Sequence, residues 1–187
     1  MKRDINRLLA MSFVFSVIAA AYTCRMLAKF DIGGVYSNYL RAALYLLLFA
    51  LWGVALDRRI IKKPVLHCLR LTAALMLLWL TLRTLKYEVV TDPTVMRYVW
   101  YFYYLPMLFI PLLGVYIALS LGQPERYRIT GKSATLAIFP TVLFLFVITN
   151  DLHQQVFAFQ GGFLDGGVYT HRPLYFACLG WMVACMS

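Results

Sequence analysis

Long apolar blocks separated by short charged stretches constrain most strongly how this chain folds. Five blocks are complete and a sixth ends with the sequence; with their flanks, they cover about residues 8–24, 39–56, 68–85, 99–121, 134–150 and 174–187. A bilayer core needs roughly 20 apolar residues, and the block at 99–121 meets this length by itself. The third block reaches it if Arg70 and Arg83 extend their charged groups to the two interfaces.

The composition excludes an ordinary soluble domain. Hydrophobic residues make up 62% of the 187 residues and charged residues only 14%, whereas soluble domains are roughly 45–50% apolar and about 25% charged. No block has the polar stripe of a surface helix. We therefore predict an all-α fold, a polytopic transmembrane helix bundle with five full spans and a truncated sixth, in one membrane domain over residues 1–187.

The positive charges are distributed unevenly between the two sides that these spans define. Eleven of the 18 Lys and Arg residues fall on the side of the N-terminus, and the positive-inside rule assigns such a side to the cytoplasm. We therefore predict a protein of the cell membrane with a cytoplasmic N-terminus. The net charge of +10 then reflects topology, and the expected partner is the lipid bilayer rather than nucleic acid. The eleven are Lys2, Arg3, Arg7, Arg58, Arg59, Lys62, Lys63, Arg70, Arg126, Arg128 and Lys132.

Two further predictions concern the ends of the sequence. The first block has a basic start and an apolar core, as signal peptides do, but Arg25 and Lys29 follow at once and further spans come after it. A retained first helix is therefore the preferred interpretation. The sixth block stops at Ser187, which predicts a fragment that lacks a cytoplasmic C-terminal output domain.

A polar run, Thr149–Gln155, follows the fifth apolar block directly. Polar groups at the depth of a membrane are unfavourable unless they face protein, water or a ligand. We expect Asn150, Asp151 and His153 to form a polar contact surface at the outer mouth of the bundle, for a small ligand or another helix. The alternative is a plain helix end that Asn150 or Asp151 caps and that water covers.

Aromatic residues and prolines are concentrated at the start of the fourth block. Trp100, Tyr101 and Tyr104 are further candidates for ligand contact, and Pro106 and Pro111 are candidate helix pivots because proline removes a backbone donor and favours a kink. At helical spacing, Tyr101, Tyr104, Leu108 and Pro111 share one face, which we expect to line a cavity. The alternative is an aromatic belt at the headgroup level. Pro140 is a kink candidate in the fifth block.

Catalytic and metal motifs do not emerge from the sequence. The four cysteines form no CxxC pair, and His153 and His171 with Asp151 and Asp165 match no strong ligand spacing. We therefore expect no catalytic residues, no metal site, no cofactor and no enzymatic activity. A membrane enzyme that uses His153 and Asp151 would need a further acid, base or metal ligand.

Two motifs carry a resemblance to a known family. They are Arg97-Tyr98-x-Trp100-Tyr101-x-Tyr103-Tyr104-x-Pro106, followed by Pro111 and Leu121-Gly122-x-Pro124, and Thr149-Asn150-Asp151-Leu152-His153. The chain resembles the N-terminal seven-helix membrane region of certain bacterial sensor histidine kinases, closest to a branch of Firmicutes membrane proteins. The resemblance covers residues 70–187 and is sharpest at 97–160. It implies a region that senses a signal and passes it to a cytoplasmic output domain.

This chain departs from that family pattern because it has no kinase histidine box and no ATP-binding motif. The leading hypothesis is a non-catalytic, multi-pass sensor or signal-transduction domain, with an unidentified small ligand or a partner membrane helix, and with a homodimer left open. The alternative is a small transporter or channel-like membrane protein. It would place polar residues near the middle of the membrane, where no block carries an Asp or Glu.

Overall fold

Helices dominate the computed structural model of this chain, which describes residues 12, 14–23, 25–26, 34–56, 62–121, 123, 132–159 and 169–187. An N-terminal helix, Val14–Thr23, precedes the labelled elements. These are α2 (Gly34–Leu56), α3 (Lys63–Thr84), the π-helix η1 (Leu85–Val89), α4 (Pro93–Phe102), α5 (Tyr104–Leu121), α6 (Lys132–Thr135), α7 (Ile138–Ile148), α8 (Asn150–His153), β1 (Phe157–Phe159), β2 (Tyr169–His171) and α9 (Pro173–Met186).

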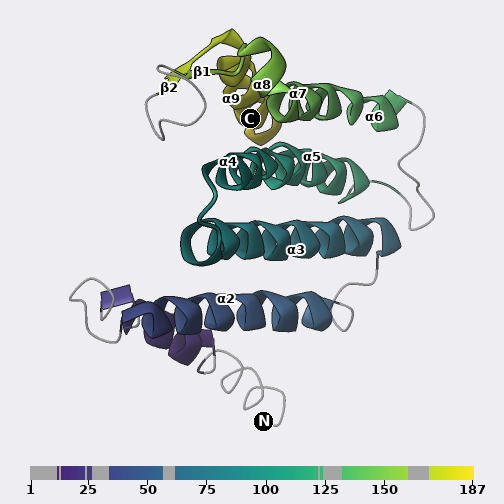
Figure 1. The fold of residues 1–187 in the computed structure, drawn as a ribbon. Coiled ribbons are helices and arrows are strands. Elements are labelled where there is room, and N and C mark those ends of the chain that lie inside the picture. Colours follow the sequence, from purple (N-terminus) through teal and green to yellow (C-terminus); the bar gives the residue numbers. More distant parts are fainter. Residues whose placement is uncertain are drawn as a thin grey trace.

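The helices lie side by side in a row (Figure 1). In this row α2 packs on α3, α3 on α5, and α5 on both α7 and α9. α4 and α5 follow one another along one rod, and the β1–β2 pair covers one end of the row beside α8 and α9. Two buried clusters hold the second half together, one around Tyr101, Leu108 and Phe157 and the other around Leu112 and Tyr116.

Among the described residues, three helices are long and apolar enough to cross a membrane: Tyr39–Leu56, Lys63–Val89 and Pro93–Leu121. In the most hydrophobic window of the first, only 6% of the residues are buried inside the molecule. Exposed apolar surface on this scale is unfavourable in water and favourable against lipid tails. A mostly helical fold with helices able to span a membrane is thus confirmed.

Five full spans are not shown. The blocks predicted at 8–24, 134–150 and 174–187 correspond to shorter apolar helices, Val14–Thr23, Ser133–Ile148 and Pro173–Met186. The all-α prediction also needs a correction, because β1 and β2 pair antiparallel with Phe157 opposite His171 and Phe159 opposite Tyr169. All three of the long apolar helices begin before the predicted blocks, at Gly34, Lys63 and Pro93. At the last two, a proline in the first turn suits a helix start.

Proline explains where two helices are interrupted. The pyrrolidine ring removes a donor and collides with the carbonyl four residues earlier. α4 ends at Phe102, four residues before Pro106. In the same way, α6 gives way to a turn at 136–137, and residue 136 lies four residues before Pro140. Pro111, in contrast, lies inside α5, which continues past it to Leu121.

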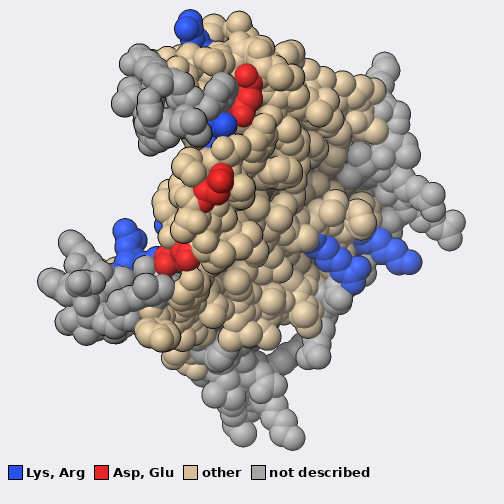
Figure 2. All heavy atoms as spheres, in the orientation of Figure 1, with Lys and Arg blue, Asp and Glu red and all other residues tan. Residues whose placement is uncertain are grey.

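The described acidic residues all lie at one end of the helices, which we call the acidic end, although Arg41, Arg83, Lys86 and Arg97 lie there as well. The acidic residues that the structure describes, Glu88, Asp92 and Asp151, belong to segments at the end where α2 begins and α3 finishes, and red atoms lie along that edge in Figure 2. At the opposite end, Lys62 donates to the carbonyls of Leu121 at 2.9 Å and Gln123 at 3.3 Å. This ammonium lies where a helix C-terminus carries partial negative charge.

Candidate functional site

The polar and aromatic candidates meet at the acidic end of the row. Asp92 begins α4, because its carboxylate accepts from the backbone N–H groups of Thr94 at 2.8 Å and Val95 at 2.9 Å. Such a cap stabilises a helix by typically about 1 kcal/mol. From this fixed start, α4 carries Arg97 and Tyr101 four residues apart and therefore on one face.

The face predicted to line a cavity is instead part of the protein interior. Tyr101 and Leu108 are completely buried, and Tyr104 and Pro111 are buried beside them. These residues share one helix face, as their spacing predicts. That face packs against α7, α9 and β1. The prediction of a cavity along this face is therefore wrong for the described residues.

Asn150 organises the backbone that follows it. Its side-chain oxygen accepts from the N–H groups of Val156 and Phe157, both at 3.0 Å, and its amide nitrogen donates to the Phe157 carbonyl at 2.9 Å. A second donor of that amide faces the Tyr101 hydroxyl at 3.3 Å. Asn150 is completely buried, so the alternative of a water-covered cap is wrong at this residue.

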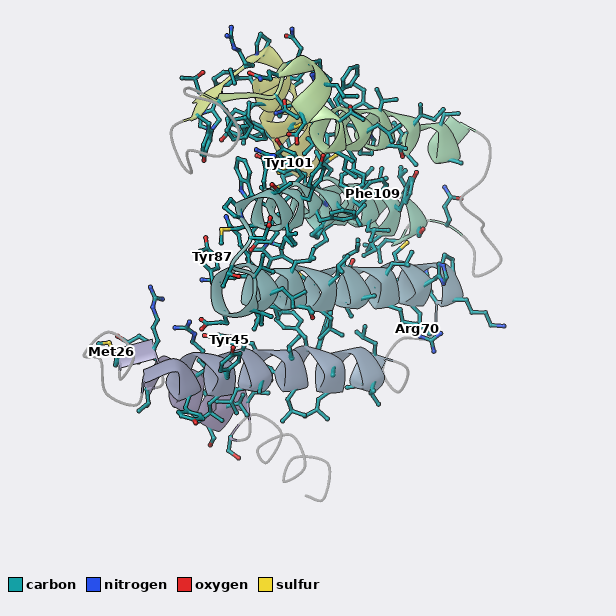
Figure 3. The ribbon with its side chains drawn as sticks, in the orientation of Figure 1. Met26, Tyr45, Arg70, Tyr87, Tyr101 and Phe109 are labelled. Atoms are coloured by element: carbon teal, nitrogen blue, oxygen red, sulfur yellow. The ribbon has the colours of Figure 1, made fainter. Side chains whose placement is uncertain are left out.

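Asp151 joins α8 to α4 through both of its oxygens. Its Oδ1 accepts the Tyr101 hydroxyl at 2.6 Å, and its Oδ2 lies 3.4 Å from the Arg97 guanidinium. The side chains of Arg97 and Asp151 are only 10% and 17% exposed, so water screens this pair less than a surface salt bridge. Figure 3 labels Tyr101 at this junction, on the side of α4 that faces α8. We call Arg97, Tyr101, Asn150 and Asp151 the polar junction.

His153 has a separate role on the same short helix. Its Nδ1 accepts from the Gln155 backbone N–H at 3.0 Å, so the proton of the neutral ring lies on Nε2, which faces the Phe146 carbonyl at 3.1 Å. Gln154 between them adopts the left-handed conformation with φ of 49°, which is where a helix commonly terminates. His153 therefore fixes the end of α8 and does not reach the polar junction.

Phe157 is the centre of the aromatic cluster beside the junction. Its ring centroid lies 4.6 Å from Trp100, 5.7 Å from Tyr104 and 5.8 Å from Tyr175. Aromatic pairs at such separations contribute about 0.5–1.5 kcal/mol beyond the area they bury. Tyr169 adds a ring from β2, 5.0 Å from Trp100. The cluster thus joins α4, both strands and α9.

The structure therefore brings together five of the six predicted contact residues. Trp100, Tyr101, Tyr104, Asn150 and Asp151 gather around the junction and Phe157, while His153 lies apart. Sequence reasoning missed Arg97 as a partner of Asp151 and Phe157 as the ring they surround. The alternation of aromatic residues in Phe157-Ala158-Phe159 is a strand signal that was available, but nothing local predicts which rings pack together.

No protein-family model matches this chain, and comparisons with curated proteins and with solved structures find no similar protein. The arrangement of the site is therefore interpreted from its own chemistry. Its groups form a closed set of hydrogen bonds, an ion pair and packed rings. Such a set is suited to holding segments in a defined arrangement.

Replacing Asn150 with Ala should destabilise the protein by about 3 kcal/mol, because two buried N–H groups lose their acceptor at about 1–3 kcal/mol each. Leu152→Ala is the matched control, since Leu152 lies on the same helix turn and is 86% exposed. Chemical unfolding in detergent, followed by tryptophan fluorescence, measures both. A change below about 0.5 kcal/mol for Asn150→Ala, the range of an ordinary surface substitution, would contradict this role.

Proposed function

We propose that this chain is a non-catalytic, multi-pass membrane domain that senses a signal at its acidic end and transmits it through the packing of its helices. The observation that carries the proposal is the polar junction, which ties α4 to α8 through Tyr101 and Asp151 across 50 positions of sequence. The resemblance to the membrane region of bacterial sensor histidine kinases supports the same role. Its two motifs contain all four residues of the junction.

A junction of this kind provides a physical basis for two states. Asp151 is shared by a hydroxyl and a guanidinium, so a new partner for either group would weaken the tie between α4 and α8. A ligand shifts an equilibrium only by its difference in affinity for the two arrangements. The interruption between α4 and α5 before Pro106 lies next to the junction and gives α4 a place to pivot. Pro111, within the continuous α5, is a weaker candidate.

The contact residues take a revised role in this proposal. Asn150, Asp151 and Tyr101 already bind one another and the backbone, so they form no empty site for a ligand. A signal therefore acts by replacing some of these contacts with new ones. Trp100 and His153 remain candidates for direct contact. Asp92 and the Lys86 side chain, which lies 5.5 Å from the Trp100 ring, add charged groups at the same end.

We further propose that the shorter helices complete a bundle with the acidic end outside the cell and the N-terminus in the cytoplasm. Eleven of the 18 Lys and Arg residues fall on the predicted cytoplasmic side of the sequence, and this excess supports the orientation through the positive-inside rule. Lys62, Lys63 and Arg70 of the predicted cytoplasmic set are described at the end opposite the acidic one, as is the backbone of Lys132. Lys2, Arg3, Arg7, Arg58, Arg59, Arg126 and Arg128 lie outside the described residues.

Single cysteines test the orientation. In a chain whose native cysteines are replaced by alanine, Arg172→Cys should react with a membrane-impermeant maleimide on intact cells, and Lys63→Cys only after permeabilisation. Both positions are exposed and belong to opposite ends of the row. If only Lys63→Cys were labelled on intact cells, the orientation would be the opposite of the one proposed.

The signalling role is tested by complementation in the organism that encodes the chain. Deletion of the gene should change a defined set of transcripts, which the wild type and Leu152→Ala restore. Asp151→Asn should fail to restore them at equal membrane abundance, because the neutral amide can still accept from Tyr101 but cannot form the ion pair with Arg97. Full restoration by Asp151→Asn would contradict the proposal. Solute flux in reconstituted vesicles, with no transcript change on deletion, would favour the transporter alternative.

A further inference from the structure

A charged cavity lies between α2 and the α3–η1 helix, away from the polar junction. Its volume is about 410 Å³, which falls within the range of small-molecule sites. The described residues that line it come from both helices and include Arg41, Ala42, Leu80, Arg83, Thr84 and Glu88. Tyr45 of α2 and Tyr87 of η1 also line it, and both are labelled in Figure 3.

The backbone on one wall is built in an unusual way. η1 is a single π-helical turn, closed by the Val90 N–H donating to the Leu85 carbonyl at 2.8 Å. Such turns occur frequently at functional sites. Here the turn carries Tyr87 and Glu88 to the cavity, and the Tyr39 hydroxyl of α2 donates to the Glu88 carbonyl at 2.9 Å. The two walls are therefore held together at the charged end.

The described charged side chains that line the cavity do not form ion pairs with one another. Within the described part of the chain, no ion pair shorter than 4.0 Å joins Glu88 to Arg41 or Arg83. Two guanidiniums from two helices therefore point to an anion, since their donor forks match the oxygens of phosphate and carboxylate groups. With Glu88 present, the three groups sum to one positive charge, which a monoanion balances and a dianion does not.

The remaining polar groups indicate what else the ligand carries. The Thr84 hydroxyl donates to the Leu80 carbonyl at 2.9 Å, so its oxygen is left as an acceptor. The Glu88 carboxylate also only accepts. A ligand that fits has hydroxyl donors near its anionic group. Ala42 and Leu80 add apolar surface, and α2 exposes most of its apolar residues, so an acyl chain can lie along the helices.

We propose that this cavity binds a phosphodiester monoanion that carries hydroxyl groups, the chemistry of a glycerol-bearing anionic phospholipid headgroup. Arg41 and Arg83 bind the phosphate oxygens, while Glu88 and Thr84 accept from the glycerol hydroxyls. The same chemistry occurs in a soluble glycerophosphodiester. The proposal does not depend on the signalling role, because lipid binding at this cavity needs no output.

Native mass spectrometry of the detergent-purified chain tests this assignment. Phosphatidylglycerol should remain bound to the wild type at least tenfold more than phosphatidylcholine, which lacks the hydroxyls and the net charge. Arg41→Gln with Arg83→Gln should reduce phosphatidylglycerol occupancy at least tenfold. Arg172→Gln is the matched control, an exposed cation of the same end that does not line the cavity, and it should bind as the wild type does.

A second variant and a soluble competitor complete the test. Ala42→Leu keeps every charge and fills the cavity, so it should also lower phosphatidylglycerol occupancy, even if the arginine variant fails to fold. Displacement of the lipid by millimolar glycerophosphoglycerol, but not by inorganic phosphate, would assign the site to a soluble diester. Equal phosphatidylglycerol occupancy in the wild type, the arginine variant and Ala42→Leu would overturn the proposal, as would equal binding of the two lipids.

Discussion

The hydrogen bonds of the Asn150 side chain determine the structure of the acidic end. One carboxamide supplies an acceptor to two backbone N–H groups and a donor to the Phe157 carbonyl. Without it, the chain leaving α8 would bury backbone groups with no partner, which is expensive where water is excluded. Because the turn is fixed, Phe157 enters the cluster of rings and Asp151 faces Tyr101. The aromatic cluster and the polar junction thus depend on one side chain.

The proposed membrane location would explain why so little of the first half is packed. α2 and α3 expose long apolar surfaces, whereas α5 buries eight of its 18 residues and packs against α3, α7 and α9. In a bilayer, lipid would cover the first kind of surface without further protein contacts. The polar groups of the described residues collect at the two ends, where headgroups and water would be present. The proposed lipid cavity and the junction are separate sites at the same end, and Lys86 lies between their neighbourhoods, with its ammonium over the rings of Tyr87 and Trp100.

Hydropathy predicted the helices better than their ends or their contacts. The blocks at 39–56, 68–85 and 99–121 correspond to helices long and apolar enough to span a membrane, because a run of apolar residues is sufficient to define them. The prolines predicted two interruptions, but Pro111 caused none, since α5 continues past it. The strand pair at Phe157 and the burial of Asn150 depend on contacts between residues distant in sequence, which one chain does not reveal. The cavity between α2 and η1 was missed for the same reason.

The coupling between Tyr101 and Asp151 is the most direct test of the junction as the tie between α4 and α8. A double-mutant cycle of Tyr101→Phe and Asp151→Ala, measured by unfolding in detergent, isolates this pair. The account predicts a coupling of about 1–2 kcal/mol, as expected for a short hydrogen bond to a carboxylate. Additive effects, within about 0.3 kcal/mol, would show that α4 and α8 are not energetically joined at this point.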